Sequence, residues 1–337
     1  MTLSAYDFLS TTLANPEQQE PMTFDFPSGK AFVEGVGMLR LEPQDDSKIS
    51  LILSVGVHGN ETGPIELVNQ LVADILAGRY KLTVRLLVLF GNPLSAIAQQ
   101  RFCKVNMNRL FSGAWQNYHG YEAERAQRLE QAVTDFFQPS KRLGHELLHY
   151  DLHTAIRGSK HEKFAVYPYM EEATYSRQQL AFLAACGIDA VLLSHQPTTT
   201  FSYYSAQHHG AHAFTVELGK VYGFGQNDLS RFSAIAQSLA DLITDSQLPQ
   251  GDLNKLLVFS VQEALIKDAE DYQLHISSEL ENFTPFEQGY VLAESSKSRY
   301  LVESTGDALI FPNAAVPIGQ RTGLVVRPQT LEKIPLG

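Results

Sequence analysis

Apolar segments with the character of buried strands alternate with amphipathic helical patterns through the first three quarters of the chain. The expected strands cover residues 48–57, 82–90, 164–168, 188–194 and 213–219, and the expected helices cover residues 65–78, 122–137, 173–186 and 229–245. In the first helix the apolar side chains recur every three or four residues, and Gly78 is placed to end it. Alternation of this kind predicts an α/β fold in which helices flank a parallel or mixed sheet.

From about residue 251 the pattern changes to short strands separated by turn residues, without a convincing helix. These strands are expected in KLLVFSVQEALI, YQLHI, GYVLAES, YLVES, DALIF and GLVVRP. The change falls near the segment SQLPQGD. We therefore expect a large domain over residues 1–250 and a small all-β domain over residues 251–337.

The charge balance limits the partners that the chain can have. Its formal net charge is −11 over 337 residues, whereas nucleic acid and anionic membrane surfaces are bound through a basic face. Neither is an expected partner, and an anionic small molecule would need cations gathered locally around it. The sequence carries no indication of an oligomeric state.

Several absences favour a cytoplasmic protein. The segment MTLSAYDFLSTTLANPEQQE lacks the basic and apolar regions of a signal peptide, and no apolar run reaches the roughly 18 residues of a membrane helix. The two cysteines, Cys103 and Cys186, do not make a disulfide framework in a chain of this length.

The segment HGNETGP, residues 58–64, follows the first expected strand directly. His58 and Glu61 are three residues apart at the carboxyl end of that strand, where open α/β sheets bind ligands, so the two side chains can reach one metal ion. The alternative is purely structural. Thr62 would cap the following helix, Pro64 would occupy its first turn, and Glu61 would complement the helix dipole.

A third ligand is available in GHELLHYDLHTA, residues 144–155, in one of two ways. HELLH matches the pattern of a zinc helix, with His145 and His149 as ligands and Glu146 as base. Alternation of apolar and polar residues instead predicts a strand that places Asp151 and His153 on one face. His153 with His58 and Glu61 would give two histidines, one glutamate and an open position, which is typical of catalytic zinc.

The motifs HGNETGP, DLHT and VELG together resemble the aspartoacylase/succinylglutamate desuccinylase family of zinc carboxypeptidase-like acylases. The resemblance covers most of the chain and implies a mixed sheet flanked by helices, with a small C-terminal β domain that narrows the active-site entrance. It also implies one Zn²⁺ per chain, bound by His58, Glu61 and His153, and Glu217 as the catalytic acid–base. The HELLH match is then accidental.

The same resemblance suggests residues that bind the substrate. In RFCKVNMNRLF, Arg101, Asn108 and Arg109 fall on family positions, although the segment is also compatible with a solvated basic loop. Arg157 and Tyr203 are further candidates, and Tyr203 is equally compatible with a packing role.

The implied activity is hydrolysis of the amide of N-succinyl-L-glutamate to succinate and L-glutamate, the last step of arginine catabolism by the succinyltransferase pathway. Aspartoacylases carry an arginine where this chain has Gln207 and a tyrosine where it has Phe311. Both differences favour the desuccinylase. The alternatives are another N-acyl-amino-acid deacylase, such as aspartoacylase, and a metal- or carboxylate-binding protein without activity.

Overall fold

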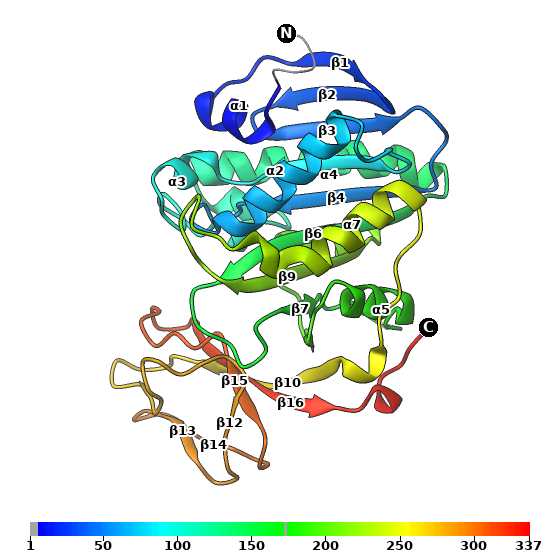
Figure 1. Ribbon diagram of the computed structural model, residues 1–337. Coiled ribbons are helices and arrows are strands. Elements are labelled where there is room, and N and C mark those ends of the chain that lie inside the picture. Colours follow the sequence, from blue (N-terminus) through cyan, green and yellow to red (C-terminus); the bar gives the residue numbers. More distant parts are fainter. Residues whose placement is uncertain (1–5, 172–173) are drawn as a thin grey trace.

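The computed structural model describes residues 6–171 and 174–337, and a single large sheet dominates it (Figure 1). Thirteen of the described strands form this sheet in the order β1-β2-β3-β5-β4-β6-β9-β7-β8-β10-β16-β15-β12. Their bounds are β1 Met22–Phe26, β2 Gly29–Gly35, β3 Met38–Pro43, β4 Ile49–Val55, β5 Arg85–Phe90, β6 Glu146–Ala155, β7 Phe164–Tyr167, β8 Ala190–Leu193, β9 His212–Lys220, β10 Leu257–Ile266, β12 Thr284–Pro285, β15 Ala308–Ile310 and β16 Arg321–Gln329.

The centre of the sheet is parallel and its flanks are antiparallel. Strands β5, β4, β6 and β9 run in the same direction, and every residue of β4 is buried. Burial on both faces explains why β4 appears in the sequence as an unbroken apolar run. β7 is antiparallel to β9 and parallel to β8, so the sheet is mixed, as expected.

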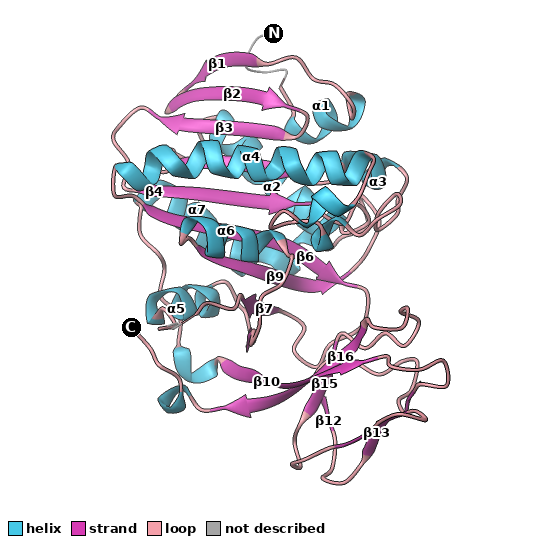
Figure 2. Cartoon of the chain, turned by 180° about the vertical axis from the view of Figure 1, so that it is seen from behind, coloured by secondary structure: helices cyan, strands magenta, loops and turns pink. Residues whose placement is uncertain are grey.

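Helices cover both faces of the parallel centre. Figure 1 shows α2 (Thr62–Leu76) and α7 (Ser233–Asp245) on one face, and Figure 2 shows α4 (Tyr121–Arg142) and α6 (Phe201–His209) on the other. The shorter helices are α1 Phe8–Ala14, α3 Pro93–Ile97 and α5 Arg177–Ala185, and the 3₁₀ turns are η2 Met107–Arg109, η3 Ala114–Asn117, η4 Leu229–Phe232, η5 Leu253–Lys255 and η6 Leu331–Lys333.

The C-terminal part consists of short strands, as expected, but it continues the main sheet. β10 pairs in parallel with β8 and antiparallel with β16, while β11 (Gln273–Leu274), β13 (Val291–Glu294) and β14 (Arg299–Leu301) form a separate small sheet. Figures 1 and 2 show this part at the end of the molecule opposite β1. A domain boundary near residue 250 stays a prediction.

Two sequence-based expectations need correction or qualification. Thr62 does not cap α2, because Glu61 occupies the cap position and the Thr62 hydroxyl donates to the Tyr222 carbonyl. The helix expected over 173–186 begins at Arg177, and residue 173 lies outside the described residues. The antiparallel strands β1–β3 and helix α6 were not foreseen.

In the part of the chain that the structure describes, no helix has the length and apolarity needed to cross a membrane.

Candidate metal centre and active site

The functional side chains gather where three neighbouring parallel strands end. β4 runs into the turn that carries His58 and Glu61, β6 carries His153 near its end, and β9 carries Glu217. The register places Val55 beside Leu152 and His153 beside Glu217. Because the carboxyl ends of parallel strands meet at one edge of a sheet, residues nearly 100 and 160 positions apart become neighbours.

The turn between β4 and α2 is held tightly. A Cβ atom at Gly59 would come within 2.2 Å of the Ala96 backbone nitrogen in α3, so only glycine fits there. The Gly59 amide donates to the Arg101 carbonyl, and the Glu61 amide donates to the His58 carbonyl. These contacts fix His58 and Glu61 relative to each other and to the loop that carries Arg101.

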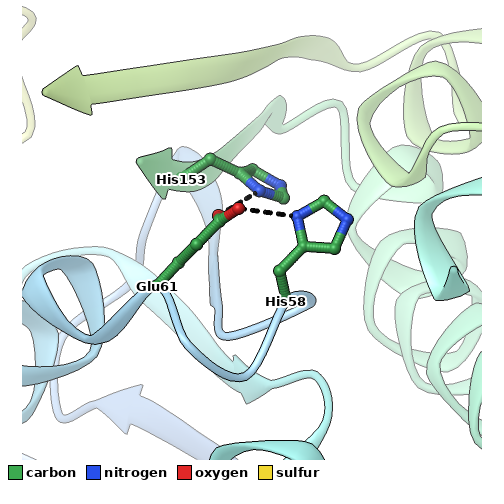
Figure 3. A group of neighbouring side chains, drawn as sticks. All are labelled: His58, Glu61 and His153. Atoms are coloured by element: carbon green, nitrogen blue, oxygen red, sulfur yellow. Dashed lines mark hydrogen bonds and ion pairs between the residues drawn. The ribbon is translucent and has the colours of Figure 1, made fainter. Parts of the chain in front are cut away.

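His58, Glu61 and His153 form a buried cluster (Figure 3). Nδ1 of His58 lies 2.9 Å from Oε1 of Glu61, and Nδ1 of His153 lies 2.8 Å from Oε2. One ligand atom from each residue falls within 4.8 Å of the others, and the exposed fractions are 3%, 1% and 1%. Among the described residues this is the one group of three histidine, cysteine or carboxylate side chains close enough to share a metal ion.

The outer nitrogen of each imidazole is already bound by a neighbouring acceptor. Nε2 of His58 lies 2.9 Å from Oδ1 of Asn106, and Nε2 of His153 lies 2.8 Å from Oδ2 of Asp151. Acceptors at Nε2 place the hydrogen there and leave Nδ1 as the ligating atom. The donor set therefore fits a divalent cation. Asp151 was expected beside a ligand, whereas Asn106 was missed, because its position depends on the path of a loop.

The charges in this cluster stabilise one another. Burial alone would raise the Glu61 pKa, but the imidazoles of His58 and His153 outweigh it and hold that pKa well below its usual value. Burial opposes protonation of His153, but Asp151 and Glu61 raise its pKa well above the usual value. Burial dominates at His58 and lowers its pKa. A cation bound here would have to displace the proton held by His153.

Glu217 lies beside His153 without a partner for one of its oxygens. Its exposed fraction is 8%, and Oε2 is buried with no hydrogen-bond partner among the described residues. Burial and the Glu61 charge raise its pKa to about 7, against the opposing effects of His153 and Arg101. A carboxyl group with this pKa and a free oxygen is suited to proton transfer near neutral pH.

The expected substrate loop brings arginines to the same region. Nη1 of Arg101 lies 2.6 Å from Oε1 of Glu61. Arg109 is exposed to solvent. Partial loss of hydration and repulsion from Arg321 and Arg101 lower its pKa to about 10. Arg109 is therefore a solvent-exposed residue whose charge is opposed by two other arginines. Asn108 is buried, and its Oδ1 accepts from the Phe201 amide.

Arg321, the first residue of β16, was not foreseen as part of this region. Its charge acts on Arg109, although it belongs to the C-terminal strands. Neither guanidinium has a carboxylate within ion-pair distance among the described residues. No sequence motif marks Arg321; only the folded arrangement relates it to Arg109.

The remaining candidates make no hydrogen bond to the metal cluster among the described residues. Nη1 of Arg157 donates to the carbonyls of Ser278 and Leu280, which fastens the loop after β6 to the C-terminal part. Tyr203 is buried in α6, and Gln207 is exposed near the end of that helix. The Phe311 ring packs against the Phe164 ring, and the backbone of Phe311 has a positive φ of 55°.

The zinc-helix alternative is wrong. Glu146 and His149 belong to strand β6, and His145 precedes it. Nδ1 of His145 lies 3.0 Å from Oγ of Ser50, and Glu146 accepts from the Gln179 side chain, so these residues do not converge.

The Glu217 carboxyl should make the stability of the metal-free protein depend on pH. Its pKa of about 7 in the folded state exceeds the ordinary 4.5, so its contribution to stability is complete below pH 4.5 and is lost as the pH rises through 7. We expect Glu217→Gln to raise the melting temperature of chelator-treated protein at pH 8. This increase should be several degrees larger than the change that the same substitution causes at pH 5. An equal effect at both pH values would contradict this account.

Comparison with known proteins agrees with this arrangement. Residues 47–243 match the model of the succinylglutamate desuccinylase/aspartoacylase catalytic domain, and residues 254–329 match the AstE/AspA barrel-sandwich hybrid domain. The chain is 46% identical to a succinylglutamate desuccinylase of Shewanella frigidimarina over 336 residues, covering 97% of both chains.

Solved structures give the same result. The succinylglutamate desuccinylase of Chromobacterium violaceum superposes with a TM-score of 0.85 at 40% identity and covers 96% of this chain and 98% of its own. The enzyme of Vibrio parahaemolyticus superposes with a TM-score of 0.89 at 33% identity, and the match covers 98% of this chain and 97% of that enzyme. With both parts of the chain matched and the buried His-Glu-His cluster in place, the protein belongs to the succinylglutamate desuccinylase/aspartoacylase family.

Proposed function

We propose that this protein hydrolyses the amide of N-succinyl-L-glutamate to succinate and L-glutamate, using one zinc ion per chain. The observation that carries the proposal is the convergence of two imidazole Nδ1 atoms and the Glu61 carboxylate beside Glu217, whose Oε2 has no partner among the described residues. Relatives named succinylglutamate desuccinylase that match nearly the whole chain support the choice of substrate.

His58, Glu61 and His153 would hold the zinc ion. Two histidines and one glutamate with a free position are the ligand set of many hydrolytic zinc sites. When bound there, zinc would supply a Lewis acid that polarises the amide carbonyl and makes water more acidic. Asn106 and Asp151 keep both imidazoles in the ligating tautomer through their contacts with Nε2.

Glu217 would carry the proton through the reaction. As general base, its carboxylate takes a proton from the attacking water while the water oxygen bonds to the carbonyl carbon. As general acid, it delivers that proton to the amide nitrogen as the carbon–nitrogen bond breaks. The products are succinate and the amine of glutamate, so one carboxyl group serves both transfers.

The substrate carries three carboxylates, and arginines bind carboxylates through two parallel hydrogen bonds. We propose Arg109 as a carboxylate ligand, together with Arg321, whose charge acts on it. Arg101 is bound to Glu61 and would be freed for the substrate once a cation engages that carboxylate. Asn108, Arg157 and Tyr203 remain candidate contacts around this group.

The organisation of the chain and its cellular setting complete the proposal. Residues 1–250 would form the catalytic domain, and residues 251–337 would form the small β domain that covers the entrance to the site. A cytoplasmic location agrees with two unpaired cysteines, Cys103 and Cys186. The reaction would complete the succinyl-linked breakdown of arginine.

The metal centre is tested by removing one proposed ligand. His153→Ala should lose the stoichiometric zinc that the wild type retains after dialysis, because only two ligands remain. His145→Ala, in the same HELLH segment, should retain it. Zinc content is measured by elemental analysis, and full zinc in His153→Ala would refute the ligand assignment.

The reaction is tested with two substrates. With zinc, the wild type should release glutamate from N-succinylglutamate much faster than aspartate from N-acetylaspartate. Glu217→Gln should keep its zinc and lose about 100-fold or more of the turnover. Preference for acetylaspartate would favour an aspartoacylase, and release of neither product would favour a binding protein.

The contribution of the C-terminal part is tested at Arg321. Loss of one charged hydrogen-bonding partner should raise the KM of Arg321→Ala for succinylglutamate about 10- to 100-fold while zinc content stays unchanged. Arg299→Ala, on the outer strand β14, is the control and should resemble the wild type. An unchanged KM in Arg321→Ala would remove this residue from the site.

A further inference from the structure

A line of buried polar side chains extends from the metal centre along β6. His149, Asp151 and His153 alternate along the strand and therefore lie on one face, with exposed fractions of 0%, 0% and 1%. Asp151 and His153 belong to the site already described. His149 does not, and a buried histidine needs partners for both ring nitrogens.

Two serines on different elements supply those partners. Nε2 of His149 lies 2.7 Å from Oγ of Ser54 on β4, and Nδ1 lies 2.7 Å from Oγ of Ser205 on α6. The Ser54 hydroxyl also lies 2.5 Å from Oδ1 of Asp151, which is its neighbour in the strand register. The contacts therefore run without interruption from α6 through His149 to the carboxylate that holds His153.

The hydrogen atoms in this series of hydrogen bonds, from Ser205 to His153, can be placed in only one way. The Asp151 carboxylate accepts at Oδ2 from His153 and, having no hydrogen of its own, also accepts at Oδ1 from Ser54. Ser54 has a single hydrogen and gives it to Asp151, so it must accept from His149. Nε2 of His149 therefore carries the hydrogen, and Nδ1 accepts from Ser205.

The surroundings keep His149 in this state. Burial lowers its pKa to about 4, so the ring is neutral at physiological pH. The ring packs edge-on against Phe201, with centroids 4.8 Å apart and an angle of 84° between the planes. A neutral, immobile ring has one donor and one acceptor in fixed directions.

We infer that His149 is a positioning residue for the metal centre, because its Nε2–H directs the Ser54 hydroxyl onto Asp151 and thereby fixes the orientation of His153. The inference rests on the proposed function for the metal itself. It assigns a role to His149, the second histidine of HELLH, which is not one of the proposed zinc ligands. Its effect reaches the ligand His153 through three hydrogen bonds, by way of Ser54 and Asp151, and does not require contact with substrate.

The test compares two substitutions of similar length. His149→Gln retains an N–H that can donate to Ser54, whereas His149→Met fills the same space without a donor. We expect zinc to bind about tenfold more weakly to His149→Met and nearly as tightly as in the wild type to His149→Gln. Competition with a chromogenic chelator measures the dissociation constant, and the melting temperature of the metal-free proteins verifies folding.

A neighbouring histidine provides the control. His145 also contacts a serine, Ser50, but this pair has no hydrogen-bonded connection to the metal ligands among the described residues. His145→Met should bind zinc as the wild type does. Equal affinities in the wild type and all three variants would overturn the inference and leave the metal centre intact. A wild type that binds no zinc would overturn the proposed function and the inference together.

A second measurement needs no variant that might fail to fold. Nitrogen-15 resonances of the imidazole rings distinguish the two neutral tautomers and the charged form. In metal-free wild-type protein at neutral pH, the His149 ring should be neutral with its hydrogen on Nε2. A hydrogen on Nδ1, or a charged ring, would overturn the inference whatever the zinc affinities are.

Discussion

The buried carboxylate of Glu61 is the interaction on which the site depends. An isolated charge in this position would cost several kcal/mol, so it must be compensated on both of its oxygens. His58 and Arg101 approach one oxygen, and His153 approaches the other. Each compensating residue comes from a different segment, so the β4–β6 register, the Gly59 turn and the Arg101 loop must all form for the carboxylate to be stable.

The parts of this arrangement that follow from local rules were predictable from the sequence. Period-two alternation allowed a strand with Asp151 and His153 on one face, and the strand-end rule indicated a ligand site at His58 and Glu61, while the family resemblance selected His153 over the zinc helix. The parts that depend on tertiary pairing were not. Asn106 reaches His58 only because its loop folds back over the β4 turn, and Arg321 acts on Arg109 only because β16 joins the main sheet.

Local charge, and not net charge, decides what this acidic chain can bind. The formal charge of −11 repels anions at long range, yet the residues around the metal centre include guanidinium groups that lack carboxylate partners among the described residues. Such groups are destabilising when poorly hydrated, which is why the pKa of Arg109 is lowered. An anionic ligand removes that cost, so the same charges that weaken the free protein favour a substrate rich in carboxylates.

Glu217, like Arg109, is unfavourable for the stability of the free protein in its charged form and useful for the proposed reaction. Its place beside His153 is fixed by the β6–β9 register, so it stays buried and near the Glu61 charge, and burial and this charge together raise its pKa. A divalent cation among the ligands would add opposite charge near Glu217 and lower that pKa again. Ionisation of the base would then follow occupancy of the metal site, and the carboxyl group that is costly to ionise in the metal-free protein would be ready to accept a proton in the loaded one.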